Sequence, residues 1–475
     1  MKKANPLGGK MKKLISLIVL VLIAGSITGC ARALKTCDAT KLDGATVCYD
    51  EKLKQYAVET DAVLVVNVDN DAVGNAVVAL WDAAHPDFAG KVTFVNTGSQ
   101  GATDRLATDT TAFPDVTMAI DGEVSRNVTH MLPVDAVLAT IIKANAVDSF
   151  YNAGNSTGVT VYAPVTYDGM AFIWNETMLT ALGLSVVDAN KDGLPDAFDT
   201  WEKIFALSTS WKTTRPSYKG APVNTVFPLS LGEVWSGYMS LTSTGWEIFS
   251  TGDATKPGYD DAKFKSSFQF LLDAKEAAIA VDELGNTLAA ENMGWKWDGV
   301  LADQSAPFGL VGTWMDPAAA AATNNVVFHI STLPTYKGNH LTPFVKTKGW
   351  VINGYTKYQS AATELLRLIY SKDGFQAMVD HSSYAPSLKD GSALTPNLDA
   401  AGVQAQFMKA FVYNYPEPFY TMPNNKTKKG MDSVFYPYMG ATLANVWNGT
   451  KTVDEAVAEL ISLANAAIAV DNVAQ

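Results

Sequence analysis

Residues 62–68, Ala-Val-Leu-Val-Val-Asn-Val, give the clearest indication of the fold class. This run is short, almost wholly apolar and rich in β-branched valine, which predicts a strand buried on both faces. A helical pattern follows over residues 75–84, and further apolar runs occupy residues 91–95 and 116–120. Strands that alternate with helices predict an α/β architecture with parallel strands.

The remainder of the chain is mixed and carries no low-complexity linker between sequential domains. From Tyr167 to Asp303 the pattern is mostly helical. Strand-like segments return at residues 326–332 and 349–353, and an Ala-rich amphipathic helix occupies residues 453–470. A chain of 475 residues is too long for a single compact core. We therefore expect two lobes that the chain builds by crossing between them more than once, with the crossing segments acting as a hinge.

Composition excludes several classes of protein. The chain has 36 basic and 48 acidic residues and a net charge of -12, whereas nucleic-acid binding requires clustered basic surface. Five histidines and three cysteines are too few and too scattered for a zinc site. The sequence contains no HExxH or P-loop motif, and we predict that the protein is not an enzyme.

The first 29 residues predict an export signal. Lysines precede a short apolar run at residues 14–24, as in a signal peptide, and the run is too short to span a bilayer comfortably. The segment Ile27-Thr-Gly-Cys30 resembles a bacterial lipobox, in which cleavage occurs before a lipidated cysteine. We therefore expect residues 1–29 to be removed and Cys30 to anchor an extracytoplasmic protein to the cell membrane. An ordinary secretory signal is the alternative.

Residues 30–60 are expected to form a tether and a small N-terminal extension. They contain Cys37 and Cys48, and export permits a disulfide between the two. Two free thiols are an equally good interpretation of the sequence.

Residues 188–199, DANKDGLPDAFD, have the pattern of a calcium loop. Such a loop needs oxygen ligands at positions 1, 3, 5, 7, 9 and 12 and a glycine at position 6, which Gly193 supplies. The predicted ligands are the side chains of Asp188, Asn190, Asp192, Asp196 and Asp199 and the backbone carbonyl of Leu194. We expect calcium to have a structural role there, fixing the loop ahead of a helix that starts at residues 200–201. A plain acidic turn is the alternative.

Short motifs spread along the chain resemble those of one family. They are FPDV at 113–116, DGMAFIWN at 168–175, TWEKI at 200–204, GTW at 312–314, TLPTYKG at 332–338 with PFV at 343–345, MPN at 422–424 and TVDEA at 452–456. In this order they resemble the extracellular solute-binding proteins of ABC transporters, in particular the maltose/maltodextrin-binding branch. The resemblance extends over nearly the whole chain after residue 61.

This resemblance implies a two-lobed α/β fold of the periplasmic-binding-protein type (type II), in which discontinuous lobes close on a ligand about a hinge. Lobe one would comprise residues 61–166 and 333–382, and lobe two would comprise residues 168–330 and 383–470. Crossings would fall near Tyr167, Thr332 and Ser383. The resemblance also implies a monomer that delivers its ligand to the permease subunits of an ABC transporter.

The resemblance places ligand-binding side chains on both lobes. Sugars are bound by carboxylates that accept hydrogen bonds from hydroxyls and by aromatic rings that stack on their apolar faces. The candidate sugar-binding residues are Asp71, Asp121, Glu123, Asp168, Glu233, Trp235, Trp314 and Tyr436. The sequence departs from the family pattern at Ala72, where the family has lysine, and at Ala119 and Gly122.

The leading hypothesis is a lipid-anchored protein that captures an oligosaccharide, with maltose or maltodextrin as the first candidate, and delivers it to an ABC permease. Another oligosaccharide is the nearest alternative. A surface adhesin that holds a glycan in the same cleft and a glycoside hydrolase are further alternatives. We expect no organic cofactor and no nucleic-acid partner, and contact with the membrane only through the lipid.

Overall fold

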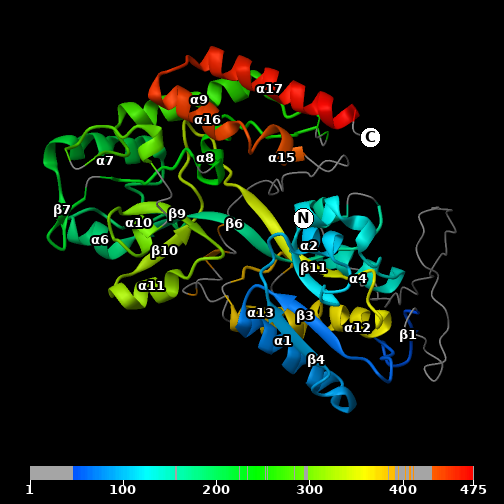
Figure 1. The fold of residues 1–475 in the computed structure, drawn as a ribbon. Coiled ribbons are helices and arrows are strands. Elements are labelled where there is room, and N and C mark those ends of the chain that lie inside the picture. Colours follow the sequence, from blue (N-terminus) through cyan, green and yellow to red (C-terminus); the bar gives the residue numbers. More distant parts are fainter. Residues whose placement is uncertain are drawn as a thin grey trace, which may run out of the picture. The chain divides into compact units, whose positions relative to one another are not determined.

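The computed structural model describes residues 46–155, 158–223, 225–232, 234–251, 253, 255–282, 284–293, 298–382, 384–390, 394, 402, 406–407, 410 and 430–473. The chain divides into two units, Met1–Cys30 and Ala31–Gln475, and the second is described below (Figure 1). The predicted signal peptide, Cys30, Cys37 and Glu233 lie outside the described residues.

A mixed sheet that begins with three parallel strands organises the fold (Figure 1). β3 (Leu64–Val68) pairs in parallel with β4 (Val92–Asn96) and with β5 (Val116–Ile120). β11 (Val345–Ile352) is antiparallel both to β5 and to β6 (Ala163–Asn175), so the strand order is β4-β3-β5-β11-β6. The three strands predicted from the apolar runs are confirmed.

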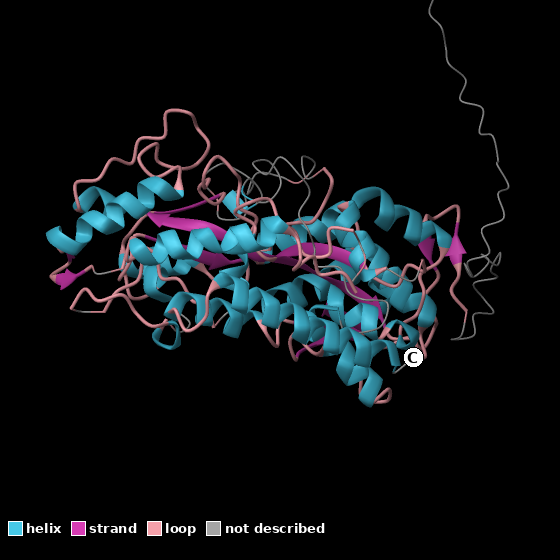
Figure 2. Cartoon of the chain, turned by 90° about the horizontal axis from the view of Figure 1, so that it is seen from above, coloured by secondary structure: helices cyan, strands magenta, loops and turns pink. Residues whose placement is uncertain are grey.

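The strand β6 extends beyond the parallel strands and carries the rest of the sheet. It is 13 residues long and is buried along its whole length. Its C-terminal part pairs antiparallel with β9 (Phe308–Gly312) and with β10 (Phe328–Ser331). Figure 2 shows the long strands inside, with helices on both sides of them. The predicted α/β class is confirmed.

Helices and short strands make up the remainder of the described chain. The helices are α1 (Asp71–Ala84), η2 (Pro86–Phe88), α2 (Ala102–Thr108), α3 (Asp121–Arg126), η3 (Val128–His130), α4 (Ala136–Asn145), α5 (Asp148–Gly154), α6 (Glu176–Ala181), α7 (Trp201–Thr214), α8 (Val234–Leu241), α9 (Ala262–Glu276), η4 (Ala290–Asn292), α10 (Asp298–Leu301), α11 (Pro317–Asn324), α12 (Gln359–Ile369), α13 (Lys372–His381), α15 (Gly430–Val434), α16 (Met439–Asn448) and α17 (Val453–Val473). Two antiparallel hairpins are formed by β1 (Tyr49–Asp50) with β2 (Gln55–Tyr56) and by β7 (Ser217–Tyr218) with β8 (Ala221–Pro222). Within the described ranges, no helix combines the length and the apolar character needed to cross a membrane.

Side-chain caps fix where two of the predicted helices begin. The Asn70 side chain accepts hydrogen bonds from the backbone N–H groups of Ala72 and Val73, so α1 begins at Asp71, earlier than the expected residue 75. The Thr200 hydroxyl accepts from the backbone N–H of Lys203, and α7 begins at Trp201 as predicted. These caps satisfy N–H groups that have no partner inside the helix.

Two large hydrophobic cores lie against different parts of the sheet. The first contains Val66 of β3 and Trp81 of α1 and is completed by α12 and α13. The second contains Phe172 of β6 and Trp201 of α7 and is completed by α9, α16 and α17. Each core buries many aromatic and aliphatic side chains, and such burial stabilises a fold by about 25 cal/mol per Å² of apolar surface. Two cores are the structural basis of two lobes.

The long strand β6 takes part in both cores. Ala163 and Val165 of β6 pack in the first core, and Met170 and Phe172 of the same strand pack in the second. The change from one core to the other therefore falls within β6, at Tyr167. The residues of β6 that pack in the first core lie before Tyr167, and those that pack in the second core lie after it.

The return path differs from the expected boundary near Thr332. Leu333, Tyr336 and Phe344 pack in the second core, and Trp350 packs in the first. The chain therefore returns within β11, and residues 333–344 pack with the second core because their apolar side chains are buried there. The other lobe boundaries stay a prediction.

The described end of the N-terminal extension, residues 46–60, packs on α12 and is not a free tether. Cys48 is buried, and its backbone N–H donates to Ser360 Oγ at 3.1 Å. The Glu59 carboxylate accepts from the backbone N–H groups of Ser360 and Ala361, both at 2.9 Å, and so caps the start of α12. Cys48 is disulfide-bonded, and its partner lies outside the described residues. The pairing of Cys37 with Cys48 remains a prediction.

Candidate functional site

Four aromatic side chains from separate segments meet where β11 begins, and we call them the aromatic group. Trp235 lies on α8, Trp314 follows β9, Phe344 precedes β11 and Tyr436 precedes α16. The ring centroids of Trp235 and Phe344 are 4.0 Å apart, those of Trp235 and Trp314 are 5.5 Å apart, and those of Phe344 and Tyr436 are 6.4 Å apart. Trp314 is 39 % exposed, so its ring is accessible to a ligand.

Gly312 determines how Trp314 is placed. A Cβ atom at position 312 would lie 2.4 Å from Trp314 Cε2, which is a steric clash that would displace the indole. The glycine therefore lets the indole lie across the backbone, where it meets Trp235 edge to face at an interplanar angle of 86°.

Lys346 of β11 places its ammonium over three rings of this group. Its Nζ lies 5.4 Å from the ring centroid of Trp235, 5.6 Å from that of Phe344 and 5.3 Å from that of Tyr436. These distances are within the range of a cation–π interaction. Burial disfavours the charged form, but Tyr436 and the Asp121 carboxylate outweigh it, so the pKa of Lys346 is raised and the side chain is charged.

Lys348, two residues further along β11, lies in a network of carboxylates. Its Nζ is 3.0 Å from Asp69 Oδ2 and 3.3 Å from Asp168 Oδ1. The Tyr384 hydroxyl donates to Asp69 Oδ1, and the Lys348 Nζ lies 5.7 Å from the centroid of the Tyr384 ring. Burial alone would lower the pKa of Lys348, but Asp168 and Asp69 raise it more. The network joins β6, β11, the end of β3 and the segment after α13.

Asp121, the first residue of α3, is a buried carboxylate at the same place. It is 1 % exposed, accepts from the backbone N–H of Gly122 at 2.6 Å and from that of Thr347 at 3.4 Å. Burial raises the pKa of Asp121 to about 7, although the positive charge of Lys346 opposes the shift. The side chain therefore exchanges its proton near neutral pH.

Glu123 lies close to Asp121 on α3 and keeps one oxygen available. Its Oε1 accepts from the backbone N–H of Gly101 at 2.6 Å. Its Oε2 is buried and accepts no hydrogen bond from the described part of the chain. Burial raises the pKa of Glu123, and the charge of Lys346 opposes this shift too. A buried acceptor without a partner costs about 1–3 kcal/mol, which a ligand hydroxyl could recover.

The structure brings most of the predicted sugar-binding residues together. Those within contact or electrostatic range of Lys346 are Asp121, Glu123, Asp168, Trp235 and Tyr436, and Trp314 joins them through Trp235. Asp71 is not among them, because the Asn70 cap makes it the exposed first residue of α1, where Asn96 Nδ2 donates to it at 2.8 Å. Asp69, two residues earlier, joins the network instead. Glu233 lies outside the described residues.

The sequence prediction missed five residues of this site: Asp69, Phe344, Lys346, Lys348 and Tyr384. One signal was present in the sequence. The segment Val345-Lys-Thr-Lys-Gly-Trp350 places two lysines at alternate positions of an otherwise apolar run, and alternate residues of a strand share one face. Charges on one face of a buried strand need partners, so this pattern indicates a polar site.

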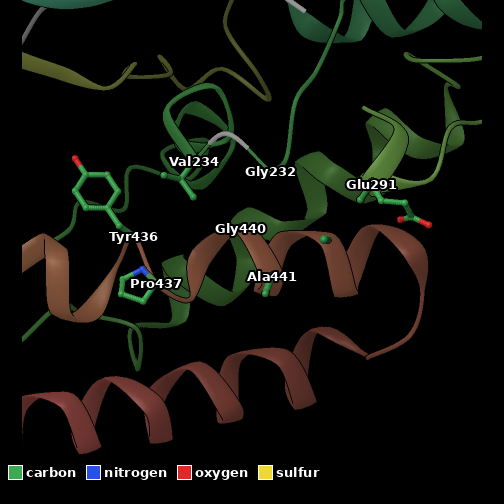
Figure 3. A pocket seen from close by; sticks show the side chains of 9 residues that line it. Gly232, Val234, Glu291, Tyr436, Pro437, Gly440 and Ala441 are labelled. Atoms are coloured by element: carbon green, nitrogen blue, oxygen red, sulfur yellow. The ribbon is translucent and has the colours of Figure 1, made fainter. Parts of the chain in front are cut away.

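An open cavity of about 410 Å³ adjoins the aromatic group at Tyr436 (Figure 3). Its walls are the start of α8, the short helix η4 and the small residues Gly440, Ala441 and Ala444 of α16. Figure 3 shows Tyr436 and Glu291 at opposite ends of this cavity. Its volume lies within the range of about 300–1,000 Å³ that is usual for ligand pockets.

The loop at residues 188–199 is closed by hydrogen bonds of its own. The backbone N–H of Asp192 lies 3.2 Å from Asp188 Oδ1 and 3.1 Å from Asn190 Oδ1, and Gly193, at a φ of 91°, donates to Asp188 Oδ2. Asp196 accepts from the backbone N–H of Ala189.

The predicted ligand at position 12 of this loop pairs with a lysine. Asp199 Oδ1 is 2.7 Å from Lys203 Nζ. In the described part of the chain, no group of three or more His, Cys, Asp or Glu side chains is arranged to hold a metal ion. The side chains of Asp188, Asn190 and Asp192 do converge on one turn, and calcium remains a prediction.

A comparison with protein families assigns the chain to one of them. The profile of the bacterial extracellular solute-binding proteins matches residues 76–406. The chain belongs to this family. A search of curated proteins finds no match. As an extracellular solute-binding protein, the chain has an extracytoplasmic location and a substrate-binding role in transport, and the two cores joined by β6 and β11 agree with a two-lobed binding fold.

The raised pKa of Asp121 predicts a pH-dependent stability. Between the ordinary aspartate pKa of about 3.9 and its pKa of about 7 in the fold, the folded protein binds more protons than the unfolded chain. The free energy of unfolding should therefore fall as pH rises through this window. The total fall should be a few kcal/mol, because each pH unit between the two pKa values contributes about 1.4 kcal/mol. The side chain of Asp121→Asn cannot ionise, so the free energy of unfolding of this variant should fall less steeply with pH.

Urea unfolding at several pH values between 4 and 8 measures this difference. Asp87→Asn, at an exposed position in η2, is the control and should keep the wild-type slope. Parallel pH profiles for wild type and Asp121→Asn would show that Asp121 is ionised throughout.

Proposed function

We propose that this solute-binding protein captures a neutral oligosaccharide at the aromatic group, with maltose or maltodextrin as the first candidate. The observation that carries the proposal is the combination of accessible aromatic faces with buried carboxylates at one place. Trp235 and Trp314 offer faces on which the apolar side of a sugar ring can stack. Asp121 and Glu123 offer acceptors for its hydroxyls.

The cavity beside Tyr436 supports an oligosaccharide over a single sugar. The ring of Tyr436 contacts both the aromatic group and this cavity, so a ligand stacked on the aromatic group has room to extend towards Glu291. The small side chains of α16 leave this path open.

Delivery to an ABC permease and a lipid anchor at Cys30 complete the proposal. The family membership supports the transport role, and the lipobox-like segment at residues 27–30 supports the anchor. If Cys48 is bridged to Cys37, Cys30 is left free for the lipid.

A glycoside hydrolase is a weaker candidate. Retaining and inverting glycosidases need one carboxylate with a raised pKa and a second that acts on the sugar directly. The pKa values of Asp121 and Glu123 are raised, but both oxygens of Asp121 accept from backbone N–H groups and Asp168 is held by Lys348, which favours binding over hydrolysis.

Replacing Trp314 tests the proposed sugar site. Trp314→Ala removes a stacking face worth about 0.5–1.5 kcal/mol and the apolar area that a sugar would cover, so the affinity for maltotriose should fall by more than about tenfold. Tyr355→Ala, which removes a 54 % exposed ring from lobe one, is the control and should bind as wild type does. Tryptophan fluorescence titrated with maltotriose measures both.

If the wild type does not bind maltotriose but binds another oligosaccharide, maltodextrin is excluded as the ligand and the proposed oligosaccharide-binding function stands. Equal affinities of wild type and Trp314→Ala for the sugar that binds would show that the ligand lies elsewhere.

The lipid anchor predicts a change of cell fraction. Expressed in a bacterium, wild type should be found with the membrane, and Cys30→Ala should be soluble because it cannot receive the lipid. Cys37→Ala keeps Cys30 and should remain with the membrane. Wild-type protein found wholly in the medium would contradict the anchor.

Calcium at residues 188–199 is also proposed, in a structural role. Binding would require the Asp199 carboxylate to turn from Lys203 towards the other loop oxygens. A ligand at a hundredfold excess over its Kd stabilises the folded state by about 2.7 kcal/mol, so a chelator should lower the melting temperature of the wild type.

Asp192→Ala removes a central ligand and should make melting insensitive to the chelator. Asp282→Ala, in an acidic turn outside the loop, should keep the sensitivity. Identical melting with and without chelator, together with no calcium by elemental analysis, would leave the plain acidic turn as the correct interpretation.

A further inference from the structure

The two lysines of β11 differ in what they contact, although they share one face of the strand. β11 is antiparallel to β6, with Lys346 opposite Asp168 and Lys348 opposite Thr166. Lys348 is fixed by two carboxylates at 3.0 and 3.3 Å. For Lys346, no carboxylate oxygen of a described residue lies within the 4.0 Å of an ion pair. Lys346 contacts aromatic faces instead.

An ammonium group has three N–H donors and no acceptor. The faces of Trp235, Phe344 and Tyr436 hold the charge of Lys346 in place but are poor acceptors for directed hydrogen bonds. Glu123 Oε2, which acts electrostatically with Lys346, is a buried acceptor that the described residues leave without a donor. Donor and acceptor are thus available to a ligand that stacks on the same rings.

We propose that Lys346 donates a hydrogen bond to the bound ligand and that the site selects neutral, hydroxyl-bearing ligands over anionic ones; this rests on the proposed oligosaccharide function. A sugar hydroxyl both accepts and donates, so it can accept from Lys346 and donate to a neighbouring carboxylate such as Glu123. Hydrogen bonds from a charged donor are about twice as strong as those between neutral groups.

The surrounding charges determine the class of ligand. Two ammonium groups, Lys346 and Lys348, act in a site that holds the four carboxylates Asp69, Asp121, Glu123 and Asp168. Above pH 7, where Asp121 is ionised, an anionic ligand would add a like charge to this excess of carboxylates, whereas a neutral sugar adds none. Selection against acidic sugars therefore follows from side chains that are present before the ligand binds.

The test compares Lys346→Met and Lys346→Arg with wild type by isothermal titration. The probes are maltotriose and a trisaccharide of the same size in which one ring is a uronic acid; cellotriose and xylotriose replace maltotriose if it does not bind. Lys357→Met is the matched control, because Lys357 also lies over a tyrosine ring, at 4.8 Å, but is exposed and pairs with Asp61 outside the site.

We expect Lys346→Met to weaken binding of the neutral trisaccharide by at least about tenfold, Lys346→Arg to retain most of the affinity, and Lys357→Met to bind as wild type. Wild type should bind the acidic trisaccharide at least about tenfold more weakly than the neutral one. If Lys346→Met melts at a lower temperature, Lys346→Gln compared with Lys346→Arg gives the same contrast between a charged and a neutral donor.

The possible failures are distinguishable. If Trp314→Ala loses the neutral sugar while Lys346→Met binds it as wild type does, the role of Lys346 is overturned and the proposed function stands. Tighter binding of the acidic trisaccharide overturns the selection for neutral ligands. If wild type binds none of the neutral trisaccharides, the oligosaccharide function and this inference both fall.

Discussion

The antiparallel pairing of β6 with β11 is the central contact of the structure, because β6 belongs to both cores and β11 leads from the second core into the first. β6 has Val165 in the first core and Phe172 in the second. The chain enters β11 from Phe344 in the second core and reaches Trp350 in the first. Charged side chains lie on the stretch between these apolar contacts, and burial obliges them to pair. Asp168 and the two lysines occupy that stretch, which concentrates the charged groups at a single place beside the aromatic group.

Local pattern was sufficient to predict the elements but not the residues that face the site. The β-branched run at residues 62–68 and the Thr200 cap act through neighbours in sequence, and the predicted strands and helix start are confirmed. Asp71 was chosen where Asp69 joins the site, since a cap at Asn70 decides which aspartate faces the end of the sheet and which lies on the helix surface. The contact between Asp69 and Tyr384 spans 315 residues, and no local pattern encodes it.

The same limit applies to the segment that follows Thr332. Apolar residues such as Leu333 and Phe344 identify a buried segment, but nothing in their own sequence says which of two cores buries them. For the lysines, alternation along β11 indicates a polar face, yet the difference between Lys346 and Lys348 arises from rings and carboxylates on other segments. Sequence thus predicts that a group is buried, and tertiary structure decides with which partners.

The distribution of contacts also determines what a ligand can do to the molecule. The carboxylates of Asp121 and Glu123 stand on α3, which packs beside the first core, whereas Trp235 and Trp314 stand on segments beside the second. A ligand shifts a conformational equilibrium only by the difference in its contacts with the two states. A sugar that stacks on the rings and also reaches α3 makes different contacts in the two states. A sugar that touches a single side makes the same contacts in both. Lys346, on the strand that leads from the second core into the first, can contact the ligand in either case. It is therefore suited to hold a ligand by a hydrogen bond, while the groups on the two sides decide whether binding changes the arrangement of the cores.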